Sequence, residues 1–254
     1  MFCTIELIPI QGKDPNEVTE EVLWKFLISL ARNGQILKNY TLVKGKNYIF
    51  YVTIPKEDSL DEAHDNEYGR QSRGLICKCY HLAITMLGDN LSSQPYCQCS
   101  ARSAMEMQTY DLDIDSPFTC CDCGKPIALY ELPFARHHHD HYFTLDWQEN
   151  YIAMDQLWMN SLYEDEHTGG ELARYDSALN QQGIELAREL SDKLHYPVYY
   201  HLFNDFSDAI RFEQVDGRNL RICPQCGERM EVLKVADEYE IAICKTCQLS
   251  ADLD

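Results

Sequence analysis

The chain has no apolar run long enough to cross a bilayer, and it has few basic residues. Its 254 residues include 22 Lys and Arg against 41 Asp and Glu, a formal net charge of −19. A membrane-spanning helix needs about 20 consecutive apolar residues. Residues 1–6 also lack the basic and apolar regions of a signal peptide. We therefore expect a cytoplasmic protein that makes no membrane contact.

The shortage of positive charge also restricts the partners. Long-range repulsion disfavours nucleic-acid phosphates and anionic lipids, whereas a basic protein surface would be attracted. Residues 143–217 contain 15 acidic and 4 basic side chains, a net of −11. Over half of the net acidity therefore lies in less than a third of the chain. The sequence also has no Walker loop and no dinucleotide-binding glycine fingerprint.

The pattern of the first 74 residues predicts a β-α-β-β start. Apolar residues alternate from Cys3 to Leu7, as in a half-buried strand. Asp14 and Pro15 are typical of a helix start, and Gly34 of its end. Residues 36–43 and 48–54 read as two strands joined by a turn. We therefore expect an α+β domain over residues 1–74, of the ferredoxin-like type.

The rest of the chain divides into two further regions. Residues 75–217 are expected to form a cysteine-rich and helical acidic region, with helices over 147–163 and 178–194 and a strand over 198–203. In residues 75–135 little regular periodicity is visible, and we expect metal to replace part of a conventional core. Residues 218–254 are expected to form a zinc ribbon.

Cysteine, by contrast, is abundant. There are twelve cysteines, and all but Cys3 fall in tight clusters. Pairs separated by one or two residues are typical of metal-binding turns, whereas a disulfide framework seldom needs so many. Cys3 itself reads as a buried thiol on a strand.

The C-terminal pattern predicts one zinc site. Two Cys-x-x-Cys pairs are separated by seventeen residues, and residues 230–235 and 239–243 can form a hairpin between them. A two-residue spacer directs both sulfurs of a pair at one ion, and four cysteine ligands leave no position for water. We therefore expect a structural, non-catalytic Zn²⁺ held by Cys223, Cys226, Cys244 and Cys247.

A second zinc site is expected in the middle of the chain. Cys120 and Cys123 form a C-x-x-C-G turn, with Cys121 spare, and the favoured partner pair is Cys97 and Cys99. Cys77 and Cys79 are the alternative pair. Some of these thiols could instead be ordinary buried side chains.

The run from His137 to His141 invites a catalytic interpretation. It is one residue short of the H-x-H-x-D-H pattern of metallo-hydrolases, and no downstream set completes a two-metal site. A Cys121–histidine nucleophilic site stays open, but nothing indicates the lowered thiol pKa it needs. We interpret the run as a solvent-exposed loop and expect no catalytic residues.

Several motifs form a pattern together with the cysteine pairs. They are Cys120-x-x-Cys123-Gly124-x-Pro126-Ile127-x-Leu129-Tyr130-x-Leu132-Pro133, Trp147-x3-Tyr151, Asp155-x-Leu157, Pro197-x-Tyr199-Tyr200 and the closing Cys-x-x-Cys pair. With these motifs the sequence resembles a bacterial family of unknown function that is described as zinc-ribbon-containing and possibly nucleic-acid-binding. The resemblance implies the ribbon and no established enzyme activity.

The acidity and the lack of a catalytic constellation favour a non-enzymatic binding protein. We expect it to neutralise a basic protein partner, as an immunity protein neutralises an antibacterial toxin. Glu164, Asp165 and Glu166 would form an acidic arm, and Trp158 would be an aromatic anchor. The alternative is a nucleic-acid-associated ribbon protein that uses the basic and aromatic residues of the 38–51 hairpin.

Overall fold

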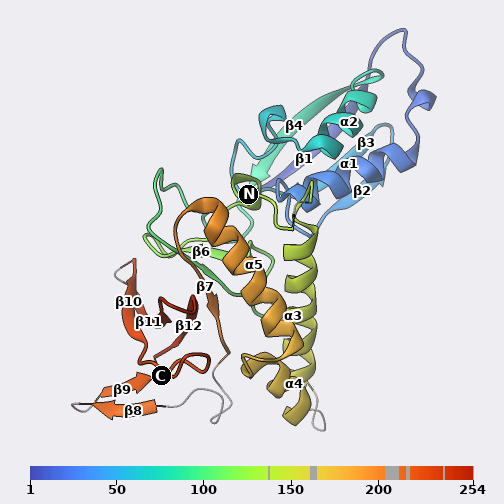
Figure 1. Cartoon of the computed structure of the whole chain (residues 1–254). Helices are drawn as coiled ribbons and strands as arrows, with labels where there is room; N and C mark the ends of the chain where they lie inside the picture. Colours follow the sequence, from blue (N-terminus) through green and yellow to red (C-terminus); the bar gives the residue numbers. More distant parts are fainter. Residues whose placement is uncertain (137, 161–164, 204–211, 216–217, 237, 254) are drawn as a thin grey trace. The chain divides into compact units, whose positions relative to one another are not determined.

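The computed structural model describes residues 1–254 except 137, 161–164, 204–211, 216–217, 237 and 254. The chain forms two compact units (Figure 1). Unit 1 comprises Met1–Tyr96, Ile114–Ser116 and Ala128–Tyr142, and unit 2 comprises Cys97–Asp113, Pro117–Ile127 and Phe143–Asp254. No helix among the described residues is both long and apolar enough to span a membrane.

The negative charge is divided unequally between the units. Unit 1 has 11 Lys and Arg against 15 Asp and Glu, a net of −4, whereas unit 2 has 11 against 26, a net of −15. The acidity noticed in residues 143–217 is therefore a property of unit 2.

Unit 1 is a four-stranded antiparallel sheet with two helices. In chain order the elements are β1 (Phe2–Pro9), α1 (Glu20–Asn33), β2 (Thr41–Lys44), β3 (Tyr48–Thr53), α2 (Glu67–Ile76) and β4 (Tyr80–Gly88). The strand order is β2-β3-β1-β4, and every neighbouring pair is antiparallel. The expected strand, helix and hairpin are present. The expected boundary at residue 74 falls inside α2, and β4 beyond it belongs to unit 1.

The core of unit 1 lies between α1 and one face of the sheet. Alternate residues of β1 (Cys3, Ile5 and Leu7) are buried against apolar residues of α1 and β3. Cys3 is fully buried, as expected from its place on a strand, and burial raises the pKa of its thiol to about 11. Helices α1 and α2 lie side by side (Figure 1), with Ser29 Oγ 3.4 Å from Ser72 Oγ.

The start of α1 differs from the expectation. Asp14 accepts a hydrogen bond from the Asn16 N–H at 3.0 Å, but this caps only a short 3₁₀ turn, Pro15–Glu17. The α-helix begins after Thr19. Gly34 ends it with a φ of +75°, as predicted. Two more 3₁₀ turns, Glu62–His64 and Leu129–Glu131, lie in unit 1.

Unit 2 combines helices with a six-stranded sheet. Its helices are α3 (Tyr142–Asn160, whose first residue belongs to unit 1), α4 (Asp165–Ala173) and α5 (Ala178–Leu194). The sheet order is β10-β11-β12-β7-β5-β6, and β8 pairs separately with β9. The strands are β5 (Met105–Met107), β6 (Phe118–Cys120), β7 (Val198–His201), β8 (Phe212–Val215), β9 (Arg218–Arg221), β10 (Glu231–Val235), β11 (Tyr239–Cys244) and β12 (Leu249–Asp252).

Strand β7 lies in the middle of this sheet. It pairs in parallel with β12 on one side and with β5 on the other. The hairpin β5–β6 and the group β10–β12 each carry one of the cysteine clusters. β7 therefore joins two cysteine-bearing halves into one sheet.

Candidate metal centres

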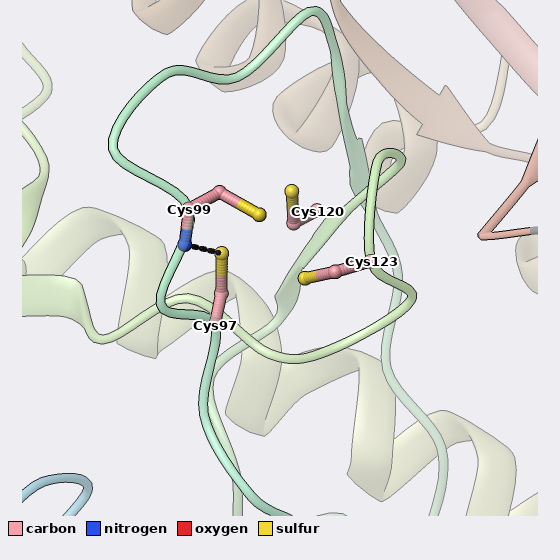
Figure 2. A group of neighbouring side chains, drawn as sticks. All are labelled: Cys97, Cys99, Cys120 and Cys123. Carbon is pink, nitrogen blue, oxygen red and sulfur yellow. Dashed lines mark hydrogen bonds between the residues drawn. The ribbon is translucent and has the colours of Figure 1, made fainter.

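The central cluster brings together the four cysteines that the sequence favoured. The sulfurs of Cys97, Cys99, Cys120 and Cys123 lie within 4.8 Å of one another. Figure 2 shows them converging from two loops. Cys77 is exposed in unit 1 and Cys79 is buried there, so the alternative pair is not part of this cluster.

Backbone hydrogen bonds hold both loops of the central cluster. The Gly124 N–H donates to the Cys120 carbonyl at 2.8 Å, and the Cys120 N–H donates to the Lys125 carbonyl at 2.9 Å. Gly124 has a φ of +65°, which a residue with a side chain rarely adopts. The Cys97 N–H donates to the Pro126 carbonyl at 2.8 Å and so ties the first loop to the second.

The four central thiols differ in how readily they ionise. Burial opposes ionisation of Cys97, but hydrogen bonds from the Cys99 N–H, from Arg102 and from the neighbouring thiols lower its pKa to about 7. The Cys99 N–H lies 3.4 Å from the Cys97 sulfur. Burial raises the pKa of Cys123 to about 11 and that of Cys120 further. A divalent cation would remove the repulsion that opposes full ionisation of the set.

The C-terminal cluster has the same design. The sulfurs of Cys223, Cys226, Cys244 and Cys247 lie within 4.8 Å of one another, with 3.6 Å between Cys226 and Cys244. Cys244 ends β11, and the β10–β11 hairpin lies close to the bounds expected for the ribbon. Cys226 is exposed and the other three are buried. A hydrogen bond from the Glu228 N–H is the main cause of a lowered pKa at Cys226, and burial raises that of Cys244 to about 11.

The two C-x-x-C-G turns are built alike. The Gly227 N–H donates to the Cys223 carbonyl at 2.9 Å and the Cys223 N–H to the Glu228 carbonyl at 2.8 Å, which repeats the bonds of the central turn. Gly227 has a φ of +74°. An isolated bridge, Thr119 with Pro126 or Ile222 with Arg229, closes each turn. The clusters therefore share one kind of turn, which supplies half of each donor set, while the other pair is Cys97-x-Cys99 in one cluster and Cys244-x-x-Cys247 in the other.

The donor chemistry of both clusters fits a soft metal ion. Each offers four sulfur atoms close enough to share one ion, a set typical of tetrahedral structural sites. A tetrahedral ion held by all four sulfurs would have no ligand position left for water. In the described part of the chain, these are the two groups of metal-ligating side chains that come together in this way.

Cys121, the spare member of the central triplet, connects the two halves. It packs in an apolar cluster with Val235, Ile241 and Ile243 from the β10–β11 hairpin. The Ala236 N–H donates to the Cys121 carbonyl at 3.1 Å. Burial raises the pKa of the Cys121 thiol to about 12, which does not suit a nucleophile.

The histidine run is not a simple exposed loop, and that expectation is wrong for Asp140 and His141. Both are 2 % exposed. The His141 N–H donates to the Arg32 carbonyl at 2.9 Å, and its ring packs edge-on against Phe134. Burial lowers the pKa of His141 to about 4, so its ring is neutral at pH 7. His139 is exposed, and His137 lies outside the described residues.

The residues proposed to bind a partner are placed only in part. Trp158 is half-buried on α3, and its ring packs edge-on against Phe203 with centroids 4.9 Å apart. Asp165 and Glu166 begin α4, and Glu164 lies outside the described residues. On either side of Trp158, Leu157 and Met159 are 52 % and 61 % exposed. In the sequence analysis Leu157 is named only as part of a family motif, and Met159 is not named.

A buried polar cluster also escaped the sequence reasoning. Glu106 on β5 is 1 % exposed and accepts a hydrogen bond from Ser250 Oγ at 2.6 Å, while His201 Nδ1 lies 3.0 Å from the same oxygen. These residues come from β5, β12 and β7 and tie the three strands together by side chains. No local sequence motif predicts this cluster, because its three residues are far apart in sequence.

Comparison with known proteins gives a family of unknown function. Residues 99–203 match a family model described as "Domain of unknown function (DUF2310)". The match includes Cys99, Cys120 and Cys123 and ends before the C-terminal cluster. The expected similarity to a family of unknown function is therefore confirmed for residues 99–203. The zinc-ribbon description of the family stays a prediction.

Two similar proteins come from Haemophilus influenzae, and both are described as uncharacterized. One is 25 % identical over 210 residues, covering 82 % of this chain and 78 % of the relative. The other is 26 % identical over 168 residues, covering 66 % and 80 %. No solved structure matches the chain.

Proposed function

We propose that this chain is a non-enzymatic zinc protein whose unit 2 binds a basic protein partner. In this proposal each cysteine tetrad holds one Zn²⁺ as a structural ion. The observation that carries it is the all-cysteine donor set, found twice and each time including a C-x-x-C-G turn with the same backbone hydrogen bonds. The ions would supply positive charge to the four thiolates of each set and so fix the two hairpins.

The fold of unit 1 is proposed to be ferredoxin-like. Support comes from the β-α-β-β-α-β chain order and the antiparallel sheet order β2-β3-β1-β4. Because such folds serve many functions, this assignment by itself carries no activity.

The binding role rests on the charge of unit 2. Its net of −15 becomes more negative when the tetrads are filled, since four thiolates with one Zn²⁺ carry about −2. Such a field accelerates encounter with a basic surface, and the exposed Leu157 and Met159 offer apolar contact beside it. The narrower proposal is an immunity protein that occupies the basic cleft of an antibacterial toxin.

Co-expression with the product of the adjacent gene tests the immunity proposal. We expect a basic toxin there, rescue of growth by this chain, and co-purification of the two proteins. A toxic neighbour that is neither bound nor neutralised would contradict it.

Charge reversal tests the acidic arm directly. We expect lysine at Glu164, Asp165 and Glu166 together to slow association with the basic partner about tenfold at low salt, because steering depends on the local field. The matched control places lysine at three exposed acids of unit 1, Glu57, Asp61 and Glu62, which changes the net charge by the same amount and should have a much smaller effect. Surface plasmon resonance measures the association rate of both variants with the basic partner. Equal effects on this rate would show that the acidic arm has no special role in binding.

Nucleic-acid binding is the alternative function. Part of the positive charge of the 38–51 hairpin is neutralised within the chain. Lys44 pairs with Glu20 at 2.9 Å and lies over the Tyr48 ring. The alternative predicts a complex with RNA or DNA that weakens steeply with salt. Absence of a complex at low salt would exclude it.

A further inference from the structure

The two edges of the unit 1 sheet differ in character. Edge strand β2 has four residues and ends on Lys44, whose charge is paired with Glu20. Edge strand β4 has nine residues, Tyr80–Gly88, with no Asp, Glu, Lys, Arg or Pro among them. Proteins usually protect sheet edges with short strands, charges or prolines. Strand β4 has none of these protections.

Strand β4 also exposes apolar side chains. Ile84, Met86 and Leu87 are 47 %, 44 % and 51 % exposed. Apart from pairing with β1, no backbone hydrogen bond in the described part of the chain involves residues 81–88. The outer edge therefore offers unpaired backbone groups beside an apolar surface.

The exposed residues continue the core layer of unit 1. Ile84 lies opposite Ile5, and Met86 lies opposite Cys3, in the register of β4 with β1. Opposite residues of an antiparallel pair point to the same face. Ile5 and Cys3 are buried beneath the helices, whereas Ile84 and Met86 are only half covered. The apolar layer thus ends uncovered at this edge.

We propose that β4 pairs antiparallel with β4 of a second copy of this chain. A two-fold axis near Ile84 would join the two four-stranded sheets and set Leu82 of each copy opposite Met86 of the other. Such a self-complementary contact is the usual form of a symmetric dimer. Charge favours this surface, because two chains of net charge −19 meet here through an uncharged strand of the less acidic unit.

Analytical ultracentrifugation of the full chain tests the dimer. The wild type is expected to approach twice its 29.5 kDa chain mass as concentration rises. Ile84→Lys places two like charges opposite each other at the axis, and Met86→Lys, made separately, places a charge opposite Leu82 of the other copy. Each should weaken dimerisation at least tenfold. Val43→Lys is the matched control. It lies on the opposite edge strand, is 41 % exposed, and should leave dimerisation unchanged.

Hydrogen exchange then locates the contact without any substitution. Outward-facing amides of residues 81–87 should become protected at high protein concentration and exchange faster on dilution. The proposal is overturned by a wild type that stays at the monomer mass throughout. It is equally overturned by a dimer that leaves these amides unprotected and tolerates Ile84→Lys.

Discussion

At the scale of single residues, the pKa values of two buried histidines are shifted in opposite directions. Burial lowers the pKa of His141 to about 4. Burial also disfavours the charged form of His201, but the hydrogen bond and charge of Glu106, with Asp252 nearby, raise its pKa above 6.5. Burial thus favours the neutral imidazole of His141 in unit 1, whereas the contact with Glu106 favours the charged form of His201 in unit 2. The stability from His201 is complete below pH 6.5 and is lost as the pH rises through its raised pKa.

His141 makes unit 1 sensitive to acid. The unfolded chain binds a proton near pH 6.5, whereas the folded chain does so near pH 4, so the free energy of unfolding falls between these values. We expect a loss of about 2 kcal/mol between pH 7 and pH 5. Hydrogen exchange of the α1 amides measures it. His141→Gln cannot titrate and should lack this part of the loss, and an unchanged pH dependence in that variant would contradict the assignment.

The sequence predicts residues well where chemistry is local. All eight proposed zinc ligands come together in two groups. Each pair could be predicted because cysteines separated by one or two residues in a turn direct their sulfurs at one point, whatever the rest of the fold. Asp140 and His141 could not be predicted as buried, since their burial comes from packing against the end of α1, more than a hundred residues earlier. The contacts among Glu106, His201 and Ser250 could not be predicted for the same reason, because they too join residues that are far apart in sequence.

At the scale of elements, α5 packs tightly against β7. A Cβ at Gly183 would overlap the Tyr200 ring and lie 2.7 Å from Trp147 Nε1. Tyr200 and Trp147 are fully buried, so neither can move away cheaply. Glycine therefore sets the distance between this helix and the sheet.

Gly183→Ala is expected to destabilise unit 2 by about 2 kcal/mol or more, because overpacking outweighs the gain in helix propensity. The matched control is Gly170→Ala in α4, where a Cβ meets nothing within 4 Å. It should stabilise slightly, by about 0.5 kcal/mol. Thermal unfolding measures the melting temperature of both variants. Similar melting temperatures would mean that Tyr200 and Trp147 can move away from the new Cβ at little cost, which would contradict the prediction.

Elements with strong local signals were predictable. Helix α5 has the predicted bounds, and its N-cap Ser177 accepts a hydrogen bond from the Asn180 N–H at 3.1 Å. Strand β4 was missed although Tyr80, Leu82, Ile84 and Met86 alternate with small or polar residues, because the region from residue 75 was interpreted as cysteine-rich with little regular periodicity. Asp14 has the features of a helix cap but serves a 3₁₀ turn five residues too early.

At the scale of the whole molecule, the six-stranded sheet of unit 2 consists of two cysteine-bearing halves joined through β7. The Ala236–Cys121 hydrogen bond and the Glu106–Ser250 bond cross between the halves. Loss of metal from one half should therefore loosen the other. No sequence signal predicts the parallel pairing of β7 with both halves, since it joins residues about fifty and ninety positions apart.

Metal content per chain tests the central claim most directly. Native mass spectrometry with elemental analysis of the full chain should find two zinc ions per wild-type chain. Cys97→Ser and Cys223→Ser should each lower the content by one ion, whereas Cys77→Ser, an exposed thiol outside both tetrads, should keep two. A wild-type chain with fewer than two ions, or an ion lost on changing Cys77, would contradict the account.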